Sequence, residues 1–175
     1  MKLSVLIPVY NEEASVAEVI RRVAAVPLAK EISVVEGAGI RTAMEAVAGD
    51  CLIIQDADLE YDPADFAKLL QPIIEGRAKV VYGVRSFTGQ KLLLRLGNRL
   101  LTWLTNRLYG THLHDMETCY KLMKAEVARG LHIECNRFDL EPEITAKIVR
   151  RGYEIHEVPI SYRPREEKKL SPWRD

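Results

Sequence analysis

The stretch of residues 52–63 reads Leu-Ile-Ile-Gln-Asp-Ala-Asp-Leu-Glu-Tyr-Asp-Pro, and it decides how the rest of the chain is interpreted. It opens with three apolar residues, and a short apolar run bounded by polar residues is typical of a buried strand. Carboxylates then follow at every second position, and alternate side chains of an extended chain share one face. We therefore expect Asp56, Asp58 and Glu60 to converge at the tip of a strand.

Carboxylates held this close repel one another and raise each other's pKa unless a cation lies among them. Oxygen ligands suit a hard ion, and Mg²⁺ is typically held by one or two carboxylates with substrate phosphates completing its shell. Asp56 and Asp58 could instead be solvated loop residues, while Asp62 and Asp65 are interpreted as caps of the following helix. We favour a Mg²⁺ or Mn²⁺ site at Asp56, Asp58 and Glu60, because solvated loops seldom place acids at the tip of an apolar strand.

The bulk composition is that of an ordinary globular protein. A length of 175 residues predicts a single domain, residues 1–175, that is large enough to bury its own core. The chain has 25 Lys plus Arg and 25 Asp plus Glu, so its net charge gives no sign of a nucleic-acid partner. Three cysteines without a Cys-x-x-Cys pair predict a reducing compartment. We expect no signal peptide at the N-terminus and no span, because no apolar run approaches about 18 residues.

Apolar runs alternate with helical patterns over the first half of the chain. Strands are predicted at residues 3–8, 32–35, 51–55 and 79–83, and helices at residues 12–26, 39–48 and 63–75. This alternation predicts a doubly wound α/β fold, with a sheet flanked by helices and ligands bound at the carboxyl ends of the strands. Residues 8–11, 56–58 and 83–85 all lie at such ends, which predicts a single site.

An amphipathic helix is predicted at residues 91–109, where the alternation stops. Leucines and Trp103 lie on one side of this helix, and the other side is polar and basic. Core packing is the usual reason for such an apolar stripe. A helix lying in a membrane interface explains the basic face and the density of leucine equally well, so both interpretations stay open. A helix at residues 140–151, a strand at residues 154–158 and a basic tail at residues 163–175 follow.

Several motifs resemble one known family. Ile-Pro-Val-Tyr-Asn-Glu-Glu at residues 7–13, the acidic stretch at residues 55–63 and Asp-Met-Glu-Thr at residues 115–118 resemble the family 2 glycosyltransferases, which have the GT-A fold. The segments at residues 137–143 and 158–162 are similar to the dolichyl-phosphate mannose synthase-like branch. That branch transfers a sugar from a nucleotide diphosphate to a polyprenyl phosphate. The match covers nearly the whole chain in the order of the family.

The resemblance implies roles for individual residues. Those implied to line the donor nucleotide pocket are Pro8, Tyr10, Asn11, Glu12 and Asp56, and those implied to hold the metal ion are Asp56, Asp58 and Glu60. The implied catalytic residues are Asp58, Arg85 and Asp115. Arg85 is expected near the phosphates, although Val84 replaces the usual serine before it, and Asp115 is expected beside the acceptor. Those implied to receive the acceptor phosphate are Arg163, Arg165 and Lys168.

The resemblance implies an inverting, metal-dependent transfer from a nucleotide-diphosphate sugar to undecaprenyl or dolichyl phosphate. It implies a peripheral protein on the cytoplasmic face of the membrane, with Mg²⁺ or Mn²⁺ neutralising charge on the leaving diphosphate. A lipid phosphate is already ionised near neutral pH, so Asp115 would orient groups rather than accept a proton. The donor sugar, its base, the lipid length and the oligomeric state stay open.

One departure from the family is large. Relatives follow the second strand with an acidic turn, a helix, a further strand and a glycine-rich loop, whereas Glu36 here runs directly into Gly37. Either a segment is deleted, or the sequence joins stretches that are not adjacent in the protein. We favour the second, because losing a strand and half of the nucleotide pocket would damage both fold and activity.

Two other functions stay open at this point. A haloacid dehalogenase-type phosphohydrolase also places Asp-x-Asp at a strand end, but on its first strand and with Thr or Val where Glu60 stands here. A catalytically impaired module that binds nucleotide sugars is the other alternative, and it requires the deletion to be real.

Overall fold

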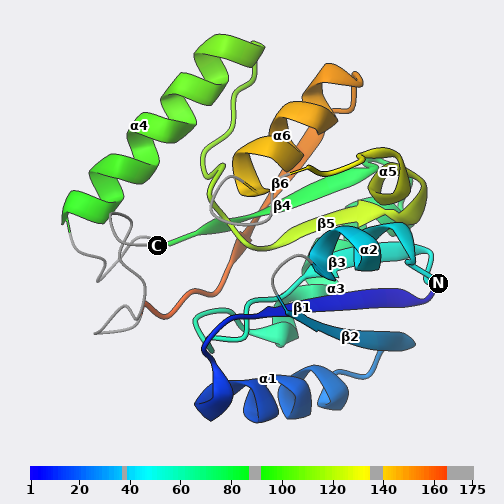
Figure 1. Cartoon of the computed structure of the whole chain (residues 1–175). Coiled ribbons are helices and arrows are strands. Elements are labelled where there is room, and N and C mark those ends of the chain that lie inside the picture. The colour runs from blue at the N-terminus through cyan, green and yellow to red at the C-terminus, as the bar shows by residue number, and fades with distance from the viewer. Residues whose placement is uncertain (37–38, 87–91, 135–139, 165–175) are drawn as a thin grey trace.

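The computed structural model describes residues 1–36, 39–86, 92–134 and 140–164. Within these ranges six strands form one sheet: β1 (Leu3–Val9), β2 (Lys30–Glu36), β3 (Cys51–Ile54), β4 (Val80–Arg85), β5 (Lys121–Lys124) and β6 (Ile155–Ile160). Their order across the sheet is β2-β1-β3-β5-β4-β6, and helices flank the sheet (Figure 1). The mostly parallel α/β sheet expected from the sequence is confirmed.

The helices follow the predicted pattern with small shifts at their ends. They are α1 (Glu13–Ala25), α2 (Gly39–Glu45), the short 3-10 helix η1 (Pro63–Asp65), α3 (Phe66–Ile74), α4 (Leu92–Tyr109), α5 (Ala125–Gly130) and α6 (Leu140–Arg150). Sequence reasoning did not predict α5, whose six residues are too few for a helical period to be visible.

One strand runs against the others. β5 lies between β3 and β4 and pairs antiparallel with both, whereas β1 pairs parallel with β2 and β3, and β4 pairs parallel with β6. Because β5 is antiparallel to each of its neighbours, β3 and β4 run in the same direction. The sequence did not predict β5, since its apolar run is short and includes the charged Lys121.

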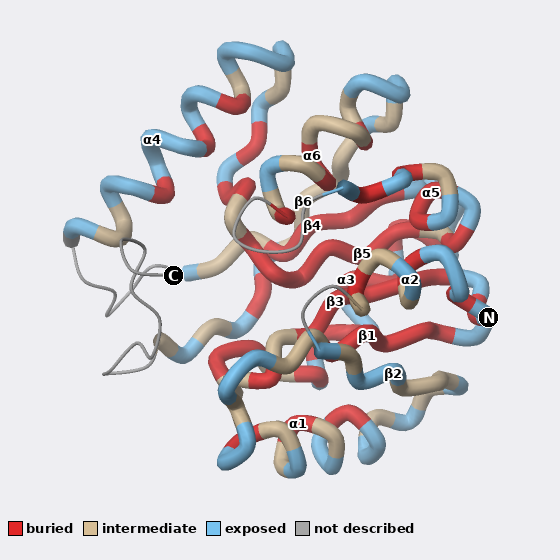
Figure 2. The backbone as a smooth tube through the Cα atoms, viewed as in Figure 1, coloured by how far each residue is buried: buried red, intermediate tan, exposed pale blue. Residues whose placement is uncertain are grey.

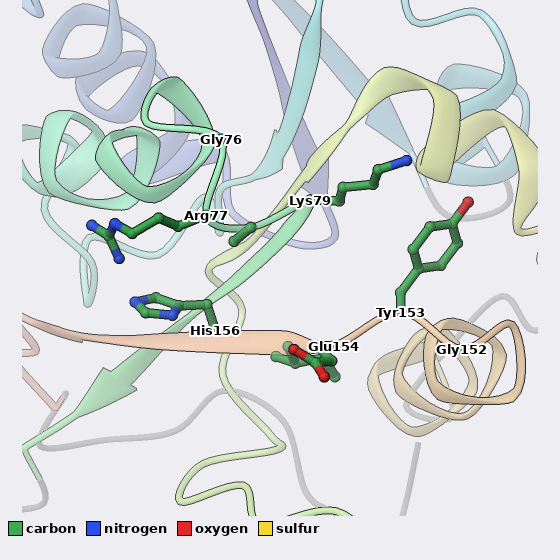
Figure 3. A pocket seen from close by; sticks show the side chains of 9 residues that line it. Gly76, Arg77, Lys79, Gly152, Tyr153, Glu154 and His156 are labelled. Carbon is green, nitrogen blue, oxygen red and sulfur yellow. The ribbon is translucent and has the colours of Figure 1, made fainter.

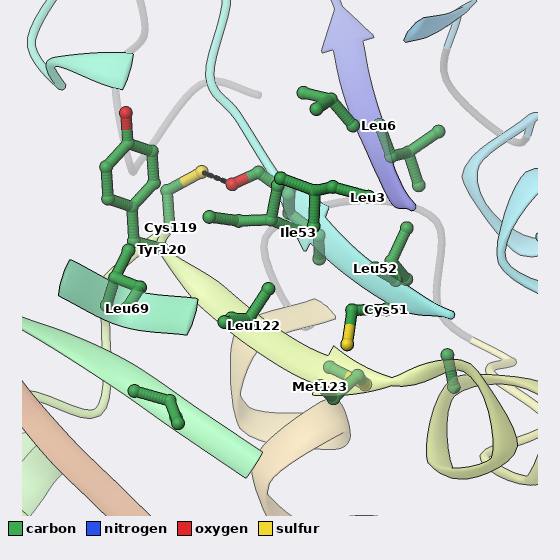
Figure 4. Packing of buried hydrophobic residues seen from close by; sticks show 14 of the residues in the cluster. Leu3, Leu6, Cys51, Leu52, Ile53, Leu69, Cys119, Tyr120, Leu122 and Met123 are labelled. Carbon is green, nitrogen blue, oxygen red and sulfur yellow. Dashed lines mark hydrogen bonds between the residues drawn. The ribbon is translucent and has the colours of Figure 1, made fainter. Parts of the chain in front are cut away.

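The core lies on and around the central strands. Leu52 and Ile53 of β3 and Leu122 and Met123 of β5 are buried side by side in the sheet (Figure 4). Just before β5, the Cys119 thiol donates a hydrogen bond to a backbone carbonyl oxygen at the end of β3, at 3.5 Å. This packing fixes the end of β3 against the segment that leads into β5.

Helix α4 stands apart from the sheet and contacts α6 (Figure 1). Among its side chains whose burial the structure describes, the buried ones are polar, namely Asn98, Thr102 and Thr105, and most of the apolar ones are exposed. Leu100 is 62% exposed and Trp103 is 61% exposed, and Figure 2 shows the exposed residues along the outer side of the helix. Packing of the apolar stripe into the core, one of the two interpretations left open above, is therefore wrong.

Some expectations fall on residues outside the described ranges. These are the Glu36–Gly37 junction, Lys91, the family-like residues 137–139, and the two tail residues Arg165 and Lys168.

Candidate active site

Three of the predicted segments lie at the same edge of the sheet. β1, β3 and β4 run in one direction, and they end at Val9, Ile54 and Arg85. The residues that follow these ends are therefore neighbours, as the doubly wound arrangement requires. β6 is parallel to β4 and ends at Ile160, so the segment leading to Arg163 reaches this edge as well.

The turn after β1 differs from the expected helix cap. Asn11 directly precedes the helix predicted at residues 12–26, and asparagine is a common helix cap, but Glu12 holds the N-cap position, and Asn11 lies in the left-handed region with φ of 53°. Asparagine tolerates this region better than most residues. The Ser15 hydroxyl donates to the Glu12 carboxylate at 2.7 Å. Tyr10 is mostly exposed and Pro8 is partly exposed, so this turn borders the edge where a nucleotide is expected.

The acidic stretch after β3 is a turn rather than an extended chain. The Glu60 amide donates to Asp58 Oδ1 at 3.0 Å, and Leu59 between them has φ of 65°. The alternation argument for Asp56, Asp58 and Glu60 is therefore wrong, because an aspartate at this place bonds its own backbone and folds the chain. Among the described residues, no three His, Cys, Asp or Glu side chains have metal-binding geometry, so a three-carboxylate set stays a prediction.

Glu60 and Asp65 fasten the end of β6 to the acidic stretch. Glu60 Oε2 accepts the Tyr162 hydroxyl at 2.6 Å, and the Glu60 carbonyl oxygen accepts the Arg163 amide at 2.9 Å. Asp65 was expected to cap a helix, and it does hold the N-cap position of α3, but its carboxylate makes no capping bond and accepts the Ser161 amide at 2.6 Å. The backbone of Arg163 is thereby held next to the acidic stretch.

The cap expected at the neighbouring aspartate is present. Asp62 Oδ1 accepts the Ala64 amide at 3.0 Å, with Pro63 in the first turn of η1. The short helix therefore begins where the sequence predicts, and it separates the acidic turn from α3.

The environment of Asp56 suits a cation. Burial raises the pKa of Asp56 to about 6, and the negative charges of Glu141 and Glu60 add to this effect, whereas a hydrogen bond from Cys119 opposes it. The charged form of Asp56 is thus disfavoured unless positive charge is supplied. Carboxylate oxygens are the donors that Mg²⁺ and Mn²⁺ prefer. The residues at this turn therefore fit a divalent ion held by one or two carboxylates and by phosphates.

Arg85 and Asp115 form a buried ion pair. Arg85 Nε donates to Asp115 Oδ2 and Arg85 Nη2 donates to Asp115 Oδ1, both at 2.7 Å. The Asp115 side chain is fully buried and that of Arg85 is 10% exposed. The Arg85 guanidinium also lies 5.3 Å from the centre of the Tyr162 ring, a distance at which a cation is attracted to an aromatic face. The structure thus joins two residues that the sequence treated separately.

A buried lysine donates hydrogen bonds to the backbone of the segment that follows Asp115. Lys121 Nζ donates to the carbonyl oxygen of Met116 at 3.0 Å and to that of Thr118. Burial lowers the pKa of Lys121 and raises the pKa of Glu117.

Some buried polar atoms of two segments have no hydrogen-bond partner in the described part of the chain. Among the described residues, the buried side-chain nitrogen and oxygen atoms without a hydrogen-bond partner are Arg95 Nε, Asn98 Oδ1, Glu117 Oε1 and Thr118 Oγ1. They belong to α4 and to the residues directly after Asp115. Buried polar atoms are normally paired, so these atoms are exceptions to the usual pattern.

Sequence reasoning missed the roles of Asn98, Lys121 and Tyr162. Asn98 lies on the polar side of the helix predicted at residues 91–109, and this polar stripe at helical spacing was the visible signal. The signal for Lys121 was a charged residue within an apolar run, and such a residue is rarely buried without polar partners.

The structure also has a hollow of about 350 Å³ at the opposite edge of the sheet, beside the starts of β4 and β6 (Figure 3). Arg77, Lys79, Tyr153 and His156 line it. None of the residues implied by the family resemblance lies there, and ligands of such sheets bind at the carboxyl ends of strands.

The family assignment follows from comparison of the sequence. The pattern of the family described as Glycosyl transferase family 2 matches residues 36–131, which is more than half of the chain. The chain belongs to glycosyl transferase family 2. The phosphohydrolase interpretation is therefore wrong, and the acidic turn follows the third strand rather than the first.

Curated relatives in this family carry the names of sugar transferases. Dolichyl-phosphate hexose transferase of Haloferax volcanii is 31% identical over 141 residues, covering 78% of this chain and 61% of the relative. Undecaprenyl-phosphate mannosyltransferase of Micrococcus luteus is 29% identical over 145 residues, covering 77% of this chain and 58% of the relative. Low-salt glycan biosynthesis hexosyltransferase Agl6 of H. volcanii is 26% identical over 200 residues, covering 94% of this chain and 48% of the relative. The chain spans about half the length of the first two relatives in this set, Agl6 and glycosyltransferase AglJ.

Solved structures of low sequence identity share the fold. Glucosyl-3-phosphoglycerate synthase from Mycobacterium tuberculosis with Mn²⁺, UDP-glucose and phosphoglyceric acid superposes with a TM-score of 0.76 at 18% identity, covering 97% of this chain and 73% of that one. The same enzyme with Mg²⁺ and UDP gives a TM-score of 0.71 at 18% identity, covering 94% and 72%. The GT-A fold expected from the resemblance is confirmed.

Proposed function

We propose that this domain binds a nucleotide-diphosphate sugar and transfers the sugar to a polyprenyl phosphate at the cytoplasmic face of a membrane. The observation that carries the proposal is the meeting of opposite charges at one edge of the sheet. Asp56 and Asp58 follow β3, Arg85 ends β4, and Arg163 follows β6. Carboxylates suit a cation and arginines suit phosphates. The names of two relatives support a polyprenyl phosphate as the acceptor.

The donor would be held by the turns after β1 and β3, with Pro8, Tyr10, Asn11 and Glu12 bordering the nucleotide. Asp56 and Asp58 would hold a Mg²⁺ or Mn²⁺ ion, which neutralises charge on the leaving diphosphate when bound. Solved structures of the same fold contain these ions together with UDP, which supports this choice. Glu60 adds negative charge beside them, although its Oε2 accepts the Tyr162 hydroxyl.

The transfer itself needs one displacement. An oxygen of the acceptor phosphate forms a bond to the anomeric carbon of the sugar, while the bond from that carbon to the diphosphate oxygen breaks. The electron pair of the broken bond leaves with the nucleotide diphosphate, and the anomeric configuration is inverted. Arg85 would orient the phosphates, and Arg163, with Arg165 and Lys168 in the tail, would receive the acceptor phosphate. Asp115 is occupied by Arg85, which supports an orienting role rather than proton transfer.

The exposed apolar side of α4 supports contact with the membrane. Leu93, Leu100, Trp103 and Leu108 all lie more than half exposed on one helix. No acidic residue occurs between Arg85 and Asp115 in the sequence, so the helix is complementary in charge to anionic lipid. A lipid acceptor also has to reach the site from a membrane. No described helix is long and apolar enough to cross a bilayer, and a helix lying in the interface needs no such length.

Replacing Leu100 with glutamate is expected to weaken binding to anionic vesicles at least about tenfold, because a buried leucine contributes about 1.5–3 kcal/mol. Vesicle co-sedimentation measures the change. Ile74→Glu is the matched control, since Ile74 on α3 is 61% exposed, close to the 62% of Leu100, but lies on another surface. Equal binding by the two variants would contradict lipid contact through α4 and would point to a protein surface covering it.

The second candidate is a module that binds nucleotide sugars without transferring them. β2 is the edge strand of the sheet, on the side where relatives are expected to add a further strand and loop. The alignment with Agl6 runs over 200 positions, more than the 175 residues of this chain, so that relative has residues with no counterpart here. A pocket open on this side would bind the base and ribose weakly.

A donor screen tests the proposed function. The protein is incubated with labelled UDP- and GDP-sugars, Mn²⁺ or Mg²⁺, and vesicles containing undecaprenyl or dolichyl phosphate. We expect label in the lipid extract with at least one donor, and loss of that label when a chelator removes the metal ion. Metal-dependent heat of donor binding without lipid product would favour the binding module, and absence of both would contradict the proposal.

A further inference from the structure

The inner side of α4 is attached to the rest of the protein by polar contacts. At successive turns, Asn98 Nδ2 donates to Asp115 Oδ1 at 3.2 Å, Thr102 Oγ1 accepts the Met116 amide at 3.2 Å, and Asn106 Nδ2 donates to the Leu113 carbonyl oxygen at 2.8 Å. We call Asn98, Thr102 and Asn106 the polar row of α4. Its spacing of four residues keeps the row on one side of the helix. The row binds the segment of residues 113–116 along its length.

Asn98 is the member of this row that touches a charged group. It bonds Asp115 Oδ1, the oxygen that also accepts Arg85 Nη2. Thr102 and Asn106, in contrast, bond backbone atoms of this segment, and Asn106 also accepts the uncharged Thr111 hydroxyl. Through Asp115, the position of α4 is therefore linked to the position of the Arg85 guanidinium. The Arg85 amide donates to the same carboxylate, at Asp115 Oδ2 and 3.1 Å, so a shift of Asp115 also changes the backbone at the end of β4.

The orientation of the Asn98 side-chain amide leaves its oxygen without a hydrogen bond from any described residue. Its Nδ2 faces the carboxylate, because the reverse orientation would place two oxygens against each other. Asn98 Oδ1 is then buried without a partner among the described residues. A buried acceptor that is left unsatisfied lowers stability. A residue that only filled space here would avoid this cost, so a role in holding Asp115 explains the arrangement better.

We propose that Asn98 is a positioning residue that ties the Asp115–Arg85 pair to α4, so that docking of α4 on lipid fixes Arg85 at the site. The inference rests on the proposed function, because it assumes that the apolar side of α4 meets a lipid surface. Docking holds the helix from its outer side, while Asn98 holds Asp115 from its inner side. The membrane surface thereby orders a residue proposed to orient the phosphates.

Amide hydrogen exchange tests the link without relying on activity. The Arg85 amide reports on Asp115, and exchange is compared with and without anionic vesicles that lack any polyprenyl phosphate. In the unchanged protein, vesicles are expected to slow exchange in α4 and also at Arg85. In Asn98→Ala, vesicles are expected to slow exchange in α4 as before but to leave Arg85 unchanged. Thr102→Val is the matched control, since it removes one bond of the polar row without touching Asp115, and Arg85 should still respond.

Activity gives a second measurement. Asn98→Ala is expected to lower kcat for the lipid acceptor about tenfold, the effect of losing one hydrogen bond to a charged group, while donor affinity measured by calorimetry stays the same. Asn98→Ser, which is too short to reach Asp115 but keeps a polar group in the buried position, should repeat both results if the alanine variant does not fold.

Three outcomes would overturn the inference. Arg85 exchange could fail to respond to vesicles in the unchanged protein, it could respond equally in Asn98→Ala or Asn98→Ser, or Thr102→Val could abolish the response to the same extent. Absence of sugar transfer by the unchanged protein would instead count against the proposed function, because the exchange measurement contains neither donor nor acceptor.

Discussion

Replacing Asp58 with asparagine is expected to lower sugar transfer about a thousandfold while the fold is kept. Asp58 Oδ1 accepts the Glu60 amide at 3.0 Å, and asparagine retains an acceptor oxygen, so the turn after β3 survives. The variant loses the negative charge proposed to hold the metal ion. A bound metal ion contributes several kcal/mol to transition-state stabilisation, and each factor of ten in rate corresponds to about 1.4 kcal/mol. Transfer of labelled sugar to lipid, with Mn²⁺ present, measures the loss.

Asp62→Asn is the matched control for this experiment. Asp62 lies in the same acidic stretch, but its carboxylate caps η1 by accepting the Ala64 amide at 3.0 Å. Asparagine is also a good cap, so stability should fall by less than about 1 kcal/mol, and transfer should stay near that of the unchanged protein. Unimpaired transfer by Asp58→Asn would exclude a metal ion at Asp58. An equal loss in both variants would indicate general damage to the stretch.

Replacing Asp115 with alanine is expected to lower the free energy of unfolding by about 3–5 kcal/mol, the usual cost of leaving a buried charge without its partner. Arg85 would lose both 2.7 Å contacts while its side chain stays only 10% exposed. Urea unfolding measures the change. Transfer should fall as well, because the guanidinium would no longer be held in one orientation.

The double variant Arg85→Met/Asp115→Leu separates stability from function. Apolar residues of similar volume often replace a buried ion pair without loss of stability, so much of the free energy of unfolding should return. Transfer should not return, since the proposed contact of Arg85 with phosphates is absent. A stable double variant that transfers sugar like the unchanged protein would show that the pair only supports the fold.

Most of the fold was predictable because the first strands are continuous apolar runs separated by helical periods. β5 and α5 were missed for the opposite reason, since each is short and β5 contains Lys121. Lys121 is tolerated there because two backbone carbonyl groups bind its ammonium. Such partners come from the folded chain and cannot be seen as a local pattern.

The strand ends that meet at the candidate site were predictable, but the contacts among their residues were not. The ends of parallel strands meet at one edge, so Asp56 and Arg85 were expected there. The turn at Asp58 was not expected, since the alternation of acids resembles a strand until the side chain bonds its own backbone. The Arg85–Asp115 pair joins residues 30 positions apart in the sequence, and no local period carries that information.

The sequence pattern of α4 did not show which side of the helix contacts the rest of the protein. An apolar stripe predicts which residues share one side of a helix, but it does not predict whether that side packs against the protein core or contacts a membrane. Here the polar row is the attached side, because it finds partners in the Asp115 carboxylate and in two backbone groups. The stripe was therefore identified correctly, and only its environment depended on the tertiary structure.

The outer side of α4 affects how the oligomeric state is measured. In detergent-free buffer, a row of exposed leucines on one helix favours pairing of two such helices, because pairing removes apolar surface from water. A dimer observed by size-exclusion chromatography in such buffer would form because no lipid covers the leucines of α4. The oligomeric state should therefore be measured with detergent or a bilayer covering the helix.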